Sequence, residues 1–117
     1  MDLSTLVPVE RTVDVLHPKT KQPTGLKLTL AHESDPRVIE ATRKVFDEAR
    51  EKGDVDPDRG RKLTMAHVVG WEWTGEATFN GERPTFSPET LAAVCKVPPV
   101  AVAIFKAIGD DAGFYEG

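Results

Sequence analysis

Three proline-containing segments determine where helices can begin in this 117-residue chain. In Ser34-Asp35-Pro36 and Ser87-Pro88-Glu89, a side chain that can cap free backbone amides stands beside a proline. Proline suits the first helical position because the N–H that it lacks has no partner there. Pro98-Pro99 must end one helix and allows Pro99 to open another. Together with glycine stops, these segments predict helices over 36–52, from 88 to about 97, and over 100–108.

The spacing of apolar residues predicts what the helices bury. The first helix has an apolar stripe at helical spacing and charged residues over the rest of its surface. The stripe consists of Val38, Thr42, Val45, Phe46 and Ala49. After a polar loop over 53–60, helical spacing returns and predicts a second, more buried helix over 62–73. Its apolar positions include Leu63, Ala66, Val69 and Trp73.

Two short segments, 12–16 and 26–30, alternate apolar and polar residues, which is typical of half-buried strands. The segment between them contains two prolines and a glycine and is too long for a tight turn, so it predicts a hairpin with an open register. A lone hairpin is only marginally stable and must pack on other elements. We therefore predict an α+β fold, mainly helical, with an N-terminal antiparallel β-hairpin (residues 12–30) packed on about four short α-helices (residues 36–117) in a single domain of residues 1–117.

Charge and hydropathy argue against several classes of partner. The chain has 15 basic and 19 acidic residues and a net charge of -4, the opposite sign from a surface that binds nucleic acid. Its most apolar run, 97–108, is interrupted by Lys106 and falls well short of the ~20 residues that cross a bilayer. Asp2 stands where a signal peptide has basic residues. The one cysteine, Cys95, forms no internal disulfide, so we expect a soluble cytoplasmic protein with no nucleic-acid or membrane partner.

The alternating carboxylates Asp54-x-Asp56-x-Asp58 are the most suggestive chemical motif, because such spacing opens the calcium loop of an EF-hand. That loop needs glycine where this chain has Arg59 and a bidentate glutamate where it has Met65. The three histidines lack the spacing of a zinc site. Cys95 lies among apolar residues, where a thiol is inert. We therefore predict that the protein is not an enzyme and has no catalytic, cofactor-binding or metal-binding residues.

Aromatic residues are candidates for contact with a protein partner. On a helix, Trp71 and Trp73 would lie roughly 200° apart around the axis, so both could not face the same core. Phe114 and Tyr115 form a second aromatic pair near the C-terminus. Exposed aromatic side chains often anchor interfaces, and we predict these four as partner contacts, with a place in a small core as the alternative for each.

The predicted last helix carries an apolar face made of Val100, Ile104 and Ile108. This face either packs inside the protein or pairs with another copy of the chain. The second alternative would make the protein a homo-oligomer.

A series of short motifs runs along nearly the whole chain. In order they are the loop HPKTKQPTG, the helix start Ser34-Asp35-Pro36, the segment from Ala66 to the Gly-Trp of Trp71, Asn80-Gly81-Glu82, the helix start Phe86-Ser-Pro-Glu-Thr90, the Val97-Pro-Pro break, and Asp110-x-x-x-Phe114-Tyr115. In this order they resemble the tail assembly chaperones of long-tailed, siphophage-type bacteriophages and prophages.

This resemblance implies a small, non-enzymatic protein of the host bacterial cytoplasm. Such a protein binds the tape measure protein, keeps this long apolar helical chain soluble, and helps to bring major tail tube subunits to it. It would be absent from the mature virion. The alternative is a structural virion component, such as a head-tail connector or tail terminator, in which the hairpin extends a sheet across subunits.

Overall fold

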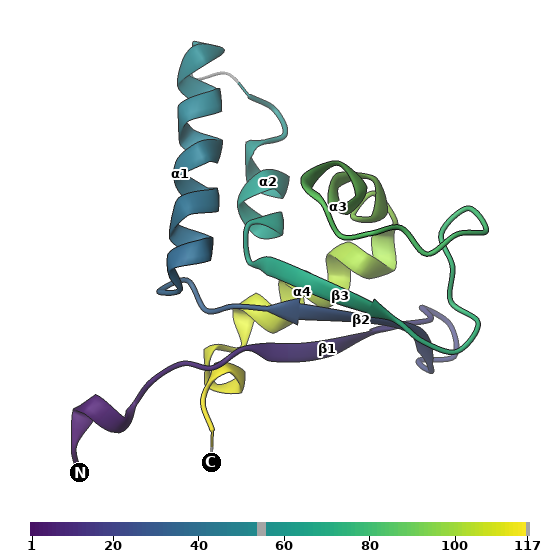
Figure 1. The fold of residues 1–117 in the computed structure, drawn as a ribbon, viewed down its shortest axis with the longest axis horizontal. Helices are drawn as coiled ribbons and strands as arrows, with labels where there is room; N and C mark the ends of the chain where they lie inside the picture. Colours follow the sequence, from purple (N-terminus) through teal and green to yellow (C-terminus); the bar gives the residue numbers. More distant parts are fainter. Residues whose placement is uncertain (54–55, 117) are drawn as a thin grey trace.

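The computed structural model describes residues 1–53 and 56–116 and shows an α+β fold (Figure 1). Within these residues it contains three strands, four α-helices and two 3₁₀ helices. In chain order these are η1 (Leu3–Thr5), β1 (Arg11–Leu16), β2 (Pro23–Leu30), α1 (Pro36–Glu51), α2 (Arg59–Met65), β3 (Val68–Trp73), α3 (Pro88–Val94), α4 (Pro98–Gly109) and η2 (Asp111–Phe114).

The predicted hairpin is confirmed as β1 and β2, but it belongs to a three-stranded antiparallel sheet of order β1-β2-β3. The prediction of a helix over 62–73 is wrong beyond Met65, because the chain turns and β3 begins at Val68. Over so short a segment, helical spacing and strand alternation select overlapping positions. The β-branched and aromatic side chains of 68–73 suit a strand, and pairing with β2 decides the outcome. The predicted helical part, 36–117, therefore contains a strand.

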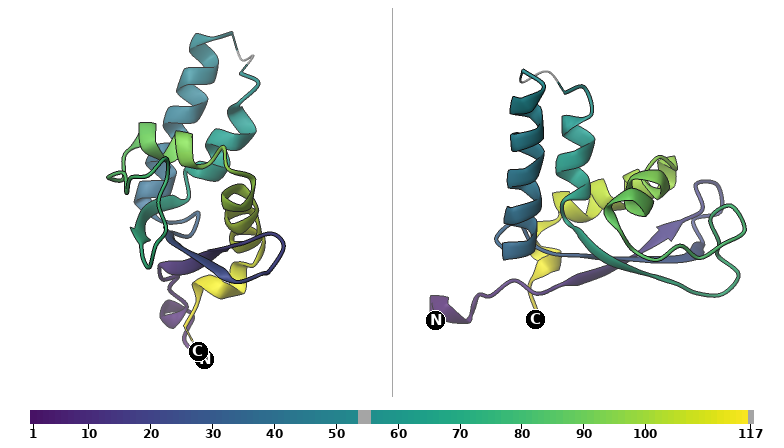
Figure 2. Two further views of the ribbon diagram at one scale, coloured as in Figure 1. Left: turned by 90° about the vertical axis from the view of Figure 1, so that its right-hand side faces the viewer. Right: turned by 45° about the horizontal axis from the view of Figure 1, so that its top comes forward.

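The sheet has one buried face and one polar face. Leu28 and Leu30 of the central strand are completely buried, and Leu26 is nearly so. α4 lies along this apolar face against β1, and α3 lies on the same side (Figures 1 and 2). On the opposite face Lys27 stands across from Asp14 on one neighbouring strand and Glu72 on the other, an alternation of charges that suits adjacent strands.

The helix starts confirm the predicted caps. Asp35 accepts a hydrogen bond from the Arg37 amide at 2.8 Å, and Ser87 forms a capping box with Thr90. α3 ends three residues earlier than predicted, and α4 begins at Pro98, one residue before the Pro99 that was expected to open it. The cause is Val97, whose backbone is extended (φ -74°, ψ 117°), as a residue before proline must be.

α1 and α2 stand side by side and rise from one end of the sheet (Figure 1). Lys62 joins them, with its ammonium 3.1 Å from a Glu48 carboxylate oxygen and 2.8 Å from one of Asp56. The Lys62 hydrogen bond lowers the pKa of the Asp56 carboxyl, so this contact contributes stability at neutral pH that is lost as pH falls. Asp54, the first carboxylate of the predicted motif, lies outside the described residues. In the apolar stripe of α1, Val38, Val45 and Ala49 are buried.

No single helix in the described part of the chain is long and apolar enough to span a membrane. Only α3 and α4 taken together are long and apolar enough, and the two helices are bent by 105° relative to each other.

Gly25 generates a prediction about fold stability. Its φ is +104°, and an added Cβ would lie 2.3 Å from the Thr74 carbonyl oxygen. We expect Gly25→Ala to reduce the free energy of unfolding by about 2–3 kcal/mol, measured by urea denaturation. Gly60→Ala is the matched control, since Gly60 lies in α2 with open space around it and alanine favours a helix. Equal stability of Gly25→Ala and the wild type would contradict the proposed clash.

Cys95 generates a prediction about pH. It is 4% exposed in the core, and burial raises the pKa of its thiol to about 11. We expect iodoacetamide to label Cys95 slowly at pH 8 and the folded state to lose stability as pH rises toward 11, since only the unfolded chain ionises readily there. Thr20→Cys in a Cys95→Ala background places a thiol in an exposed loop and should label fast. Fast labelling of Cys95 in the folded protein would contradict this account.

Candidate functional site

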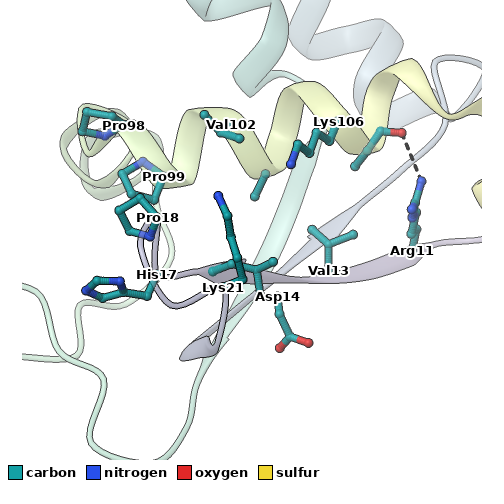
Figure 3. A pocket seen from close by; sticks show the side chains of 13 residues that line it. Arg11, Val13, Asp14, His17, Pro18, Lys21, Pro98, Pro99, Val102 and Lys106 are labelled. Carbon is teal, nitrogen blue, oxygen red and sulfur yellow. Dashed lines mark hydrogen bonds between the residues drawn. The ribbon is translucent and has the colours of Figure 1, made fainter.

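The clearest candidate site is a groove between the β1–β2 hairpin and α4, which we call the α4 groove (Figure 3). Its cavity volume is about 550 Å³, within the roughly 300–1,000 Å³ of typical ligand pockets. Its lining consists of Arg11, Val13, Asp14, Leu16, His17, Pro18 and Lys21 from the hairpin, and Pro98, Pro99, Val102, Ala103, Lys106 and Ala107 from α4. Most of these contribute apolar atoms, so the groove offers an apolar floor with a few charges around it.

α4 supplies apolar side chains on two opposite faces. Val100 and Ile104 are at most 2% exposed and pack into the core. Val102 and Phe105 lie on the outward face and are 51% and 67% exposed. Val102 lines the groove. A helix that is apolar on both faces leaves surface that a partner can cover.

The hairpin loop holds its wall of the groove through His17. The His17 Nδ1 atom accepts hydrogen bonds from the backbone amides of Lys19 and Thr20 at 3.1 and 3.3 Å. The His17 amide donates to the Gln22 carbonyl at 2.9 Å. Lys21, between them, has a left-handed backbone with φ +63°, which is uncommon for a residue with a side chain. The loop therefore fixes the direction of the Cα–Cβ bond of Lys21, and its side chain extends toward α4 (Figure 3).

Arg11 joins β1 to the C-terminal end of α4. Its guanidinium donates to the Ala107 and Asp110 carbonyls at 3.2 Å each and pairs with the Asp110 carboxylate at 3.2 Å. The Ala107 carbonyl also accepts from the Asp110 amide at 3.3 Å, and the Asp110 carbonyl accepts from the Gly113 amide at 3.1 Å. The negative end of the helix dipole attracts the cation. A Cβ on Gly113 would lie 2.3 Å from this guanidinium. Arg11 thus fixes the position of α4 over β1 at one end of the groove.

A second depression lies between α1, α2 and α3 and measures about 750 Å³. Two of its basic side chains pair with carboxylates, Lys62 with Glu48 at 3.1 Å and Arg37 with Glu10 at 2.6 Å, while Lys44 forms no ion pair with a described residue. In the α4 groove, Lys21 and Lys106 form no ion pair with any residue in 1–53 or 56–116. We take the α4 groove as the candidate site because these two lysines lie beside its apolar lining and the exposed Val102 of α4.

The predicted tryptophan contacts do not stand on opposite faces. Because 68–73 is a strand, Trp71 and Trp73 share one face of the sheet, with ring centroids 5.6 Å apart. Trp71 also packs edge-on against Phe86 at 5.1 Å and donates to the Pro84 carbonyl at 3.1 Å. Trp73 Nε1 is buried and has no acceptor among the described residues. Both indoles are half-buried against the core.

The C-terminal aromatic pair is divided between core and surface. Phe114 is 2% exposed, and its carbonyl accepts from the Val9 amide at 2.7 Å. Tyr115 remains 36% exposed, beside His32. Of the apolar face predicted on the last helix, Val100 and Ile104 pack inside and Ile108 packs against the core while partly buried. The exposed residues Val102 and Phe105 were missed, although their helical offset from Val100 and Ile104 indicated an apolar outer face.

Across residues 1–53 and 56–116, no group of three His, Cys, Asp or Glu side chains is placed to hold a metal ion. Asp56 is occupied by Lys62, as described above, and Asp58 pairs with Arg61 at 3.3 Å. His32 Nε2 is 2.8 Å from an Asp111 carboxylate oxygen. His17 lies elsewhere, in the hairpin loop. In comparisons with known proteins, no family model, curated protein or solved structure matches this chain.

Arg11 provides a test of how the groove is held together. We expect Arg11→Met, which keeps the aliphatic stem, to lower the free energy of unfolding by about 1–2 kcal/mol, because two carbonyls at the end of α4 lose a charged donor. Arg43→Met is the matched control, since Arg43 makes only exposed pairs within α1 and its loss should cost less than about 0.5 kcal/mol. Urea denaturation of both variants measures the difference. Equal effects would mean that Arg11 does not hold α4.

Proposed function

We propose that this protein is a tail assembly chaperone of long-tailed phages or prophages that binds an apolar segment of the tape measure protein in the α4 groove. The observation that carries the proposal is the apolar outer face of α4, where Val102 and Phe105 are exposed beside an apolar groove. The ordered motif resemblance supports the identity of the partner.

The site suits reversible holding of apolar helices. An amphipathic helix can lay its apolar face into a groove and bury it without any chemical step. Holding such a chain in solution requires that its apolar surface be covered until assembly, which needs a binding surface and no catalytic residue. The proposed place of action is the host bacterial cytoplasm, the major tail tube protein is a further partner, and the protein leaves before the virion is complete.

The test is co-expression with the tape measure protein encoded in the same tail gene cluster. We expect the wild type to increase the soluble fraction of the tape measure protein severalfold and to co-purify with it, because its apolar segments become covered. The double variant Val102→Asp, Phe105→Ser should lose both effects. Ile39→Ser is the matched control, since Ile39 is an exposed apolar residue (56%) on α1, outside the groove. A tape measure protein that stays insoluble with the wild type would refute the proposed function.

One observation favours a second candidate, a structural virion component such as a head-tail connector or tail terminator. Among the described residues β1 pairs with β2 alone and lies at the edge of the sheet, and edge strands can pair with another chain. Mass spectrometry of purified particles separates the two candidates. A permanent component is present at fixed stoichiometry, whereas a chaperone is absent.

A further inference from the structure

The α4 groove carries a charge opposite to that of the whole chain. The chain has a net charge of -4, yet the groove is lined by Arg11, Lys21 and Lys106 and by a single carboxylate, that of Asp14. The Asp14 carboxylate points away from α4 (Figure 3), on the sheet face where Lys27 stands opposite it. The space between the hairpin and α4 is therefore electropositive.

Two of these three cations have no counter-ion within the described residues. Arg11 is paired with Asp110 at 3.2 Å and serves the end of α4. Lys21 and Lys106 come from opposite walls, and both side chains extend toward the space between the walls (Figure 3). Two like charges facing one space repel each other, and a carboxylate placed between them would relieve that repulsion.

The backbone at Lys21 supports a role for this lysine. A left-handed conformation is energetically unfavourable in a residue with a side chain and persists where the surrounding structure imposes it. Here the Lys21 amide donates to the His17 carbonyl at 2.9 Å. Glycine or asparagine would adopt this conformation at lower cost, but neither would bring a positive charge to the groove.

The apolar lining beside the cations identifies the kind of occupant. Val13, Pro18, Pro99 and Val102 supply an apolar surface in the same groove as the two lysines. Such a surface matches apolar side chains and not a sugar-phosphate backbone, which is recognised by polar and cationic contacts. A fitting occupant presents apolar side chains to the floor and carboxylates to the rim.

We infer that the α4 groove selects an amphipathic helix whose apolar face is flanked by Asp or Glu side chains. This inference rests on the proposed function and adds the charge of the tape measure segment that is bound. Lys21 and Lys106 act as specificity-determining residues, while Val102 and the prolines provide contact area. Binding should weaken as salt concentration rises, because the rim pairs are exposed to solvent.

A second copy of the chain is a competing occupant of the groove. The N-terminal segment that contains η1 extends away from the sheet and helices (Figure 1) and exposes Leu3, Leu6 and Val7. Val9, which follows it, is held by the Phe114 carbonyl. The one carboxylate of this N-terminal segment, Asp2, is engaged in capping η1 through the Ser4 amide at 3.0 Å. It therefore offers apolar side chains but no free carboxylate for the lysine pair.

The test uses two synthetic helical peptides of about 20 residues with the same Leu/Ala face. One is flanked by Glu and the other by Lys, and fluorescence anisotropy measures their affinity for the full-length protein. We expect the Glu peptide to bind at least about tenfold more tightly than the Lys peptide. Lys21→Glu with Lys106→Glu should reverse this preference. Lys19→Glu with Lys96→Glu makes the same change in net charge outside the groove lining and should leave the preference intact.

Each outcome decides the inference. Equal affinity for both peptides, or no effect of the Lys21 and Lys106 reversal in a variant with wild-type circular dichroism, would overturn it. Analytical ultracentrifugation tests the second copy as the occupant. A wild-type dimer that becomes a monomer when residues 1–9 are deleted, and whose groove is uncovered only after that deletion, would assign the groove to a second copy and overturn the inference.

If the tape measure protein is solubilised by the wild type and equally by the double reversal, the charge inference fails while the proposed function stands. If the Glu peptide binds but the tape measure protein is never solubilised, the function fails alone.

Discussion

The fold depends on covering one apolar sheet face. The central strand β2 places Leu26, Leu28 and Leu30 on that face with almost no exposure, and a three-stranded sheet cannot bury a face by itself. α4 supplies the cover with Val100 and Ile104, and Arg11 fixes it to β1 through the helix end. The groove is a consequence of this packing: α4 covers the sheet with one face, and its outer face is left beside the raised hairpin loop.

Charge pairing distinguishes the structural parts of the molecule from the candidate site. In the α1–α2 pair, Lys62 lies between the Glu48 and Asp56 carboxylates and joins the two helices. Exposed pairs contribute little individually. At the groove the pattern changes, because the Lys21 and Lys106 side chains share a space whose only lining carboxylate is turned to the other sheet face.

Local signals in the sequence predicted much of the fold, and long-range ones did not. The caps at Asp35 and Ser87 and the alternation in β1 and β2 depend on neighbouring residues, and the structure confirms them. The segment 68–73 was misassigned because its state is decided by pairing with β2, some 40 residues earlier in the chain. Phe46 belongs to the predicted apolar stripe of α1 but is 45% exposed. Helical spacing shows which residues share a face of the helix, but it does not show how much of that face the rest of the protein covers. The α4 groove was not predicted, because its two walls come from residues 11–21 and 98–107, which are far apart in the sequence.

The Arg11 contact also bears on the order in which the molecule can form. Its guanidinium bonds to a carbonyl 96 residues later in the sequence, so the hairpin leaves the ribosome long before the helix that covers it. Contacts so distant in sequence form late, because the intervening chain must first be ordered. During synthesis the leucine face of β2 is therefore open, and a chain that stops before α4 has neither a covered sheet nor a groove. The groove exists only when α4 is packed on the sheet, so the proposed partner binding requires this long-range packing to be complete.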